Sequence, residues 1–288
     1  MYSVTLIPRE EVLSEWTTMR IGGVTEHFYE PLSPEDVCLL LAHFRSEGVK
    51  PFVLGGGSKV VIKDGVFTRP VISMRSLCNV KFDGETVFAA AGVMLPNLIK
   101  MCVERGLGGI EVLCGIPATV GGAVVMNAGT KCGSFGDFVS AVEFANGDKL
   151  FTKRRDELVF SYRRGPVQGG EVVVGVWLNL KTSSPQTLME RMHKILKERV
   201  TTQPMNKPSA GCVFKNPSPH HSAGYLIERV GLKGYRVGGA QFSSKHANFI
   251  INTGNATFKD VLELIETARK RVKKVFGVEL QTEMRLIS

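Results

Sequence analysis

The chain has 288 residues, of which 43% are hydrophobic and 22% are charged, a balance that is ordinary for a globular protein of two or three domains. No apolar run approaches the roughly 20 residues of a membrane helix, and residues 1–10 lack the basic region and apolar core of a secretory signal. The six cysteines form no Cys-x-x-Cys pair, which argues against a disulfide framework or a zinc site and indicates reduced thiols.

The net charge of +9 is unevenly distributed. Residues 1–189 hold 19 basic and 19 acidic side chains, so the whole surplus lies in residues 190–288. A basic segment can bind nucleic acid or a small polyanion. Because this one shows no recognisable nucleic-acid motif and no row of stacking aromatic residues, we favour a small ligand, such as a nucleotide diphosphate that also carries a carboxylate.

Helical and strand patterns alternate up to the change in charge. Caps, apolar periodicity and terminal glycines define these elements. Helices are predicted at residues 34–48, 96–105 and 184–200, and strands at residues 51–54, 87–92, 139–150 and 172–180. Residues 160–165, between the last two strands, are predicted to form a surface turn.

Two glycine-rich segments interrupt this part of the chain. Residues 55–58 follow a strand and can turn backbone N–H groups toward an anion, although they match no P-loop and a flexible turn is the alternative. Residues 115–129 combine glycine with small, almost uncharged side chains. We expect this second segment to be a loop rather than a helix, with its backbone packed against a large flat ligand.

The most unusual stretch, residues 207–217, is bracketed by prolines and holds Cys212 ahead of two strand-forming residues. Taken alone, this stretch is explained equally well as a proline-flanked turn in which the cysteine is only a small buried side chain. The elements predicted around it are helices at residues 222–230 and 257–276 and strands at residues 245–252 and 278–287. The apolar stripe of the second helix is Val261, Leu264, Ile265, Ala268, Val272 and Val275, and the last strand alternates, with Glu279, Gln281, Glu283 and Arg285 on one face.

Several motifs of this chain are modest individually, but together and in this order they are specific for one protein family. They are Leu54-Gly55-Gly56-Gly57-Ser58, residues 115–129, Ser161-Tyr162-Arg163, residues 208–217, Lys245-His246-Ala247-Asn248-Phe249 and Glu283-Met284-Arg285. Over residues 17–287 the chain closely resembles the UDP-N-acetylenolpyruvoylglucosamine reductases of peptidoglycan synthesis. The short spacing between Arg163 and Cys212 matches the form of the family that lacks an extra tyrosine loop over the substrate.

The resemblance implies an α+β fold with a two-part FAD-binding domain of the vanillyl-alcohol-oxidase (PCMH) type and a C-terminal α+β substrate-binding domain. The expected boundaries are residues 1–77, joined by 282–288, and 78–190 for the two FAD-binding parts, and 191–281 for the substrate-binding domain. It also implies non-covalent FAD, NADPH as co-substrate, and reduction of UDP-N-acetylglucosamine enolpyruvate to UDP-N-acetylmuramate. We expect a cytoplasmic monomer with no bound metal, no nucleic-acid partner and no membrane insertion.

Ligand contacts follow from the same resemblance. The FAD pyrophosphate would lie near residues 55–58 and the ring system along residues 115–129. The implied cofactor-binding residues are Leu54, Gly55, Gly56, Gly57, Ser58, Gly115, Ile116, Pro117, Thr119, Gly121, Gly122, Asn127, Ala128 and Gly129. Candidates for contacts with the nucleotide sugar are Tyr162, Arg199, Lys215, Asn216 and Lys245, among which Asn216 has the firmest match.

Three residues match catalytic positions of the family. Hydride addition at C3 of the enolpyruvyl group leaves negative charge that spreads from C2 into the carboxylate, and preorganised polar groups must stabilise it. Arg163 and Glu283 match that role, which a glutamate can fill only as a hydrogen-bond donor. Cys212 matches the residue that protonates C2, where the family usually has serine; a thiol, with an ordinary pKa of about 8.5, is a far stronger acid than a serine hydroxyl.

Two further positions depart from the family pattern, and two other functions remain open. Lys59 stands where asparagine is usual and Ala118 where glycine is usual, and either change could alter the flavin loops. One alternative is another PCMH-type flavin oxidase, acting on sugars or small alcohols, which would leave the set Arg163, Cys212 and Glu283 unexplained. The other is a non-enzymatic protein that binds nucleic acid or a nucleotide sugar, which would use only the charge.

Overall fold

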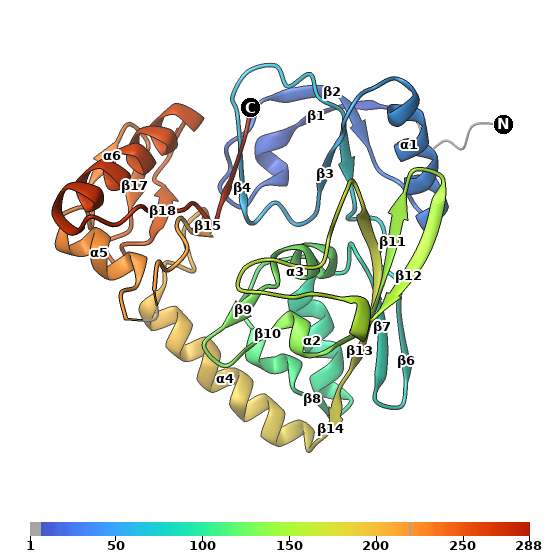
Figure 1. Ribbon diagram of the computed structural model, residues 1–288. Coiled ribbons are helices and arrows are strands. Elements are labelled where there is room, and N and C mark those ends of the chain that lie inside the picture. The colour runs from blue at the N-terminus through green and yellow to red at the C-terminus, as the bar shows by residue number, and fades with distance from the viewer. Residues whose placement is uncertain (1–6, 219) are drawn as a thin grey trace. The chain divides into compact units, whose positions relative to one another are not determined.

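The computed structural model describes residues 7–218 and 220–288, and the chain divides into two compact units (Figure 1). Unit 1 contains residues 26–56 and 68–197 together with residues up to 10, and unit 2 contains residues 11–25, 57–67 and 198–288. Residues 1–6, which belong to the stretch predicted to hold no secretory signal, lie outside the described residues. Within the described ranges, no helix is long and apolar enough to cross a membrane. The finer division into three parts stays a prediction.

The larger sheet of unit 1 is antiparallel throughout, in the order β12-β11-β13-β7-β6. Its strands are β6 (Val80–Asp83), β7 (Thr86–Ala90), β11 (Val139–Asn146), β12 (Lys149–Arg154) and β13 (Val172–Asn179). The single strand predicted over residues 139–150 is wrong, because Gly147 has φ +61° and the chain reverses there into a hairpin. Glycine adopts this left-handed conformation without a steric penalty.

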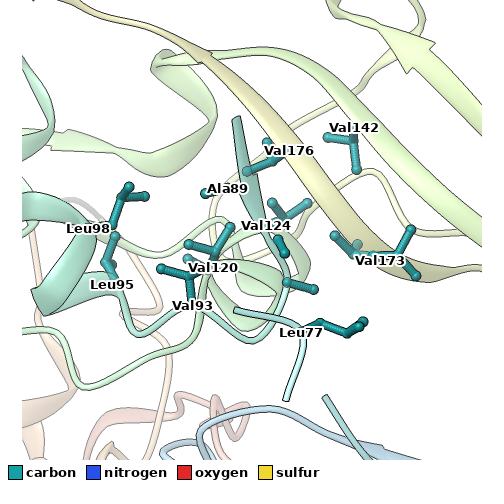
Figure 2. Close-up of a cluster of buried hydrophobic side chains, with 14 of the residues drawn as sticks. Leu77, Ala89, Val93, Leu95, Leu98, Val120, Val124, Val142, Val173 and Val176 are labelled. Carbon is teal, nitrogen blue, oxygen red and sulfur yellow. The ribbon is translucent and has the colours of Figure 1, made fainter. Parts of the chain in front are cut away.

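Three predicted helices of unit 1 form near the expected positions. α1 (Pro34–Ser46) begins at a capping box and packs on β11 and β12, and α4 (Pro185–Thr202) runs from unit 1 into unit 2. α2 (Leu95–Glu104) contributes buried leucines to the core. Figure 2 shows these leucines on one side of Val120 and Val124, with the valines of β13 on the other.

A second sheet, built mostly from residues of unit 1, leads directly to the first glycine segment. Its order is β1-β2-β5-β3, and β2 and β3 both pair in parallel with β5. These strands are β1 (Arg9–Val12), β2 (Val24–Tyr29), β3 (Phe52–Leu54) and β5 (Val71–Ser73). Two short strand pairs are also present: β8 (Leu107–Gly108) with β14 (Lys181–Thr182), and β9 (Gly129–Thr130) with β10 (Gly133–Ser134). Short 3-10 helices form at Leu13–Trp16, Ile110–Leu113, Phe135–Asp137 and Arg155–Glu157.

Unit 2 is built on an antiparallel sheet in the order β15-β18-β17-β16. Its strands are β15 (Ser209–Cys212), β16 (Arg236–Val237), β17 (Ala240–Phe242) and β18 (Phe249–Asn252). α6 (Phe258–Phe276) packs on β16 and β17, and α5 (Ala223–Arg229) packs on α6. The predicted apolar stripe of α6 is buried except for Val275, which is 63% exposed, because residues 273–277 at the end of the helix are all exposed.

The C-terminal segment differs most from its prediction. Only β19 (Arg285–Ile287) is a strand, and it pairs in parallel with β4 (Val60–Ile62). The N–H groups of Glu283 and Met284 both donate to the Val213 carbonyl, at 2.7 and 3.4 Å. Two residues thus oppose one, as in a β-bulge, which breaks the period of two. Glu283 is therefore buried, whereas the residues predicted on its face, Glu279, Gln281 and Arg285, are exposed.

Candidate active site

The two glycine-rich segments meet within unit 1. A Cβ atom added to Gly55 would lie 2.5 Å from the Thr119 hydroxyl oxygen, and one added to Gly56 would lie 3.2 Å from the Thr119 backbone nitrogen. Contacts this short leave no space for a side chain at either glycine. The sequence places glycine here because the backbones of residues 55–56 and 117–119 touch, and together they present a surface almost free of side chains.

The second glycine segment is not a continuous loop, contrary to our expectation. Residues 120–126 form α3 (Val120–Met126), whose N-cap, Thr119, accepts a hydrogen bond from the Gly122 N–H at 3.3 Å. Glycine in a helix costs about 1 kcal/mol, but burial of Val120 and Val124 offsets this cost. Gly121 also has a packing role, since its Cβ would lie 2.9 Å from that of Ala91.

Asn127 ends α3 and ties it to the turn that carries Arg163. Asn127 has φ +41°, a left-handed conformation that asparagine tolerates. Its side chain donates to the Ser161 carbonyl and accepts from the Gly136 N–H, both at 3.0 Å. Arg163, also at positive φ, donates to the Gly129 carbonyl at 3.1 Å, so the predicted turn at residues 160–165 is held against the second glycine segment.

These segments fit an FAD group. A dinucleotide needs backbone that it can approach closely and few charged side chains around its ring system, and the joined glycine segments offer both. Ala118, the departure from the family pattern, is buried, and its carbonyl accepts from the Leu95 N–H at 2.8 Å. Its methyl group is therefore accommodated inside unit 1. The residues that would hold FAD are those of residues 54–58 and 115–129 named from the sequence.

Cys212 lies in unit 2, at the end of β15. The preceding Gly211 has φ +71° and interrupts the pairing register between Ser209 and Cys212. The thiol belongs to a half-buried residue and is not in a disulfide. Val213 and Phe214, which follow, are fully buried and anchor the segment in the core of unit 2. The stretch is thus a turn that leads into a strand, as predicted, but Cys212 is only half-buried, and its role as an acid stays a prediction.

Glu283 lies beside the Cys212 segment and is paired with Lys59. The Glu283 N–H donates to the Val213 carbonyl at 2.7 Å, and its side chain is only 5% exposed. The Lys59 ammonium is 2.6 Å from the Glu283 carboxylate and donates to the Cys212 carbonyl at 3.0 Å. In unit 2 the Lys59 ammonium therefore joins the Glu283 carboxylate to the backbone of Cys212, and these three residues form one cluster.

Lys59 is the member of this cluster that sequence reasoning did not assign. From the sequence, Lys59 is only a departure from the family pattern that could alter the flavin loop. A lysine that directly follows consecutive glycines and precedes a short buried strand was the available signal. The sequence could not show its partner, because the β4–β19 pairing joins distant ends of the chain. Arg163 belongs to unit 1, where its guanidinium donates to the Gly129 carbonyl and lies over the Tyr162 ring.

The candidates for nucleotide-sugar contacts have varied surroundings. The Asn216 side chain accepts from the Ala223 N–H at 3.1 Å, at the start of α5, and the Lys215 N–H donates to the Gln281 carbonyl at 2.9 Å. The Lys245 ammonium donates to the Val200 carbonyl at 2.7 Å, beside Arg199 near the end of α4. Tyr162, in unit 1, is 55% exposed. Their contacts with a ligand remain predictions.

Two family profiles match the chain. Residues 203–287 match the family described as UDP-N-acetylenolpyruvoylglucosamine reductase, C-terminal domain, and residues 25–149 match an FAD binding domain. The mixed helix and strand content, with an FAD-binding domain followed by this C-terminal domain, confirms the predicted fold class.

Relatives extend the similarity over nearly the whole chain. The UDP-N-acetylenolpyruvoylglucosamine reductase of Moorella thermoacetica is 42% identical over 275 residues, which cover 95% of this chain and 91% of that protein. The protein of the same name from Thermotoga petrophila is 39% identical over 278 residues, with 96% and 97% covered. The crystal structure of the Thermus caldophilus reductase superimposes with a TM-score of 0.84 at 36% identity, covering 98% of this chain and 99% of that one.

Proposed function

Because the chain belongs to the UDP-N-acetylenolpyruvoylglucosamine reductase family, we propose that it reduces UDP-N-acetylglucosamine enolpyruvate to UDP-N-acetylmuramate with NADPH as the reductant. The protein is an oxidoreductase, and the FAD-binding domain match supports FAD as its cofactor. The product is a precursor of peptidoglycan. We expect non-covalent FAD and a monomeric, cytoplasmic enzyme.

The observation that carries the proposal is the cluster of Cys212, Glu283 and Lys59 in unit 2. A half-buried thiol can donate a proton to a carbanion, and it is a better acid than the hydroxyl that the family usually places there. The Lys59 ammonium, which contacts the Cys212 carbonyl, and the Glu283 carboxylate provide fixed charges near this residue. The Glu283 side chain is almost fully buried, where electrostatic effects are strong. We assign Cys212 as the acid that protonates C2.

Bound FAD would supply the hydride that reaches C3 of the enolpyruvyl group. Arg163 then stabilises the negative charge that spreads into the substrate carboxylate, because its guanidinium can donate two hydrogen bonds to a carboxylate. Its hydrogen bond to Gly129 supports this role by fixing the side chain. Glu283 is assigned to the same developing charge. Because its carboxylate is paired with Lys59 in this chain, the ammonium is the hydrogen-bond donor of that pair.

The basic C-terminal third suits the rest of the substrate. Lys215, Asn216, Lys245 and Arg199 lie in the part of the chain that carries the whole positive surplus, and a UDP-sugar carries the opposite charge. Electrostatic attraction of this kind raises the rate of encounter more than it fixes geometry. We propose that these residues contact the diphosphate and uridine.

The purified protein tests the proposal in two steps. It should be yellow, with a flavin absorption band, and NADPH should be consumed only when UDP-N-acetylglucosamine enolpyruvate is present. A colourless protein that takes up no added FAD would refute every flavoenzyme reading. A yellow protein that oxidises sugars or small alcohols with oxygen, and ignores the enolpyruvyl substrate, would favour the oxidase alternative.

A further inference from the structure

The Lys59 ammonium contacts two groups in the cluster of unit 2. It lies 2.6 Å from the Glu283 carboxylate and donates to the Cys212 carbonyl at 3.0 Å. A lysine ammonium has three donors, so one side chain can satisfy both contacts at once. The ammonium therefore contacts both the Glu283 carboxylate and the backbone of Cys212, the residue proposed as the acid.

The structure fixes Lys59 at its backbone and at its tip. The Lys59 carbonyl accepts from the Arg285 N–H at 2.8 Å, which joins β4 to β19 two residues beyond Glu283. At the other end, a Cβ atom on Gly211 would lie 3.2 Å from the ammonium nitrogen. The glycine before Cys212, which already adopts φ +71°, therefore also leaves the space that the ammonium occupies.

The charge of Glu283 requires a partner here. Its side chain is 5% exposed, and a buried carboxylate without compensation is costly. The substrate of the proposed reaction brings a second carboxylate, whose negative charge increases as the enolate forms. If the charge of Glu283 were left uncompensated, it would repel this ligand. The Lys59 ammonium makes the pair neutral before the ligand arrives.

We propose that Lys59 is a positioning residue for the reaction: it balances the charge of Glu283 and holds the Cys212 backbone, so that a carboxylate-bearing ligand can bind beside Glu283. This role rests on the proposed function.

Product binding to the holoenzyme provides a test that does not depend on turnover. Calorimetry with UDP-N-acetylmuramate gives the affinity. We expect Lys59→Asn to bind the product at least about tenfold more weakly, since removing one partner of a buried charge pair costs at least this much. Lys59→Arg, which keeps the positive charge, should recover most of the affinity.

Two further variants separate charge from fold. Glu283→Gln removes the charge that Lys59 balances, so adding Lys59→Asn to it should weaken product binding much less than Lys59→Asn weakens that of the wild type. Lys63→Asn, an exposed lysine at the other end of β4, should bind like the wild type. Equal affinity in wild type and Lys59→Asn would overturn the inference. A wild-type enzyme that neither binds the product nor uses the enolpyruvyl substrate would instead overturn the proposed function.

Discussion

The Lys59 ammonium and the Glu283 carboxylate form an ion pair at 2.6 Å between residues near opposite ends of the chain. The parallel pairing of β4 with β19 brings their segments together. The same ammonium donates to the Cys212 carbonyl, so three segments of unit 2 converge on one cluster.

The first prediction concerns pH. A thiol donates a proton only while it is protonated, so activity should fall on the alkaline side as Cys212 ionises, near or below the ordinary thiol pKa of about 8.5. In Cys212→Ser this limb should move to higher pH or disappear. The measurement is kcat/KM for the enolpyruvyl substrate between about pH 6 and pH 10, with Cys78→Ser, at an exposed thiol, as control. An identical alkaline limb in Cys212→Ser would exclude the thiol as the acid.

The second prediction separates the two halves of the reaction. Cys212→Ala should still let NADPH bleach the flavin at the wild-type rate, because no proton from Cys212 is needed in that half. The enolpyruvyl substrate should then fail to restore the colour promptly, with a loss of about 100-fold or more, the usual contribution of a general acid. Stopped-flow absorbance measures both phases separately. Prompt restoration of the colour by the substrate would remove Cys212 from the mechanism.

The third prediction concerns FAD binding in unit 1. In Gly55→Val the new Cβ would lie 2.5 Å from the Thr119 hydroxyl, so the two glycine segments would have to separate. We expect FAD affinity to fall at least about tenfold, alongside the roughly 1–3 kcal/mol that overpacking costs. Flavin fluorescence during titration of the apoprotein measures the affinity. Gly48→Asn is the control, because nothing lies within 4 Å of its Cβ and asparagine tolerates positive φ; an equal loss in both variants would contradict the contact.

The fourth prediction concerns stability at acid pH. Hydrogen bonds, above all from the Thr257 backbone N–H, lower the pKa of the Asp260 carboxyl group at the start of α6. A group whose pKa is lowered on folding stabilises the protein above its unfolded pKa of about 3.9, and this contribution is lost as pH falls through the folded pKa. Asp260→Asn should therefore lower the free energy of unfolding at pH 7 by about 0.5–1 kcal/mol and flatten its decline toward pH 3.

Urea denaturation at several pH values checks this fourth prediction. Glu263→Gln, an exposed site on the same helix, should leave the free energy of unfolding and its pH dependence close to those of the wild type. If Asp260→Asn lost no stability at pH 7, or lost as much at pH 3 as at pH 7, the carboxylate would not be what stabilises the start of α6.

Much of the fold was predictable from local signals. The capping boxes of α1 and α6 and the glycine that ends α6 lie where the sequence indicated, because these motifs act within one turn of helix. The failures involved tertiary context. Glycine content argued against a helix at residues 120–126, yet α3 forms because its valines are buried and Gly121 packs against Ala91. The C-terminal alternation failed because two N–H groups share the Val213 carbonyl.

The candidate site was predictable only in part. Motif order singled out Cys212 and Glu283, and the structure brings them together with Lys59 in unit 2. Lys59 could not be assigned from local sequence, because its role depends on the β4–β19 pairing and on the space left by Gly211. A salt bridge between residues so far apart in the chain leaves no periodic or spacing signal. Departures from a family pattern, such as Lys59 and Cys212, were nevertheless the right positions to examine.

The most direct test of the central claim follows the flavin of the wild-type enzyme without oxygen. NADPH should bleach the absorption near 450 nm, and UDP-N-acetylglucosamine enolpyruvate should then restore it, with one UDP-N-acetylmuramate formed per flavin reoxidised. Flavin that NADPH does not reduce, or reduced flavin that stays bleached with this substrate and recovers only when oxygen is admitted, would contradict the assignment as an enolpyruvyl reductase.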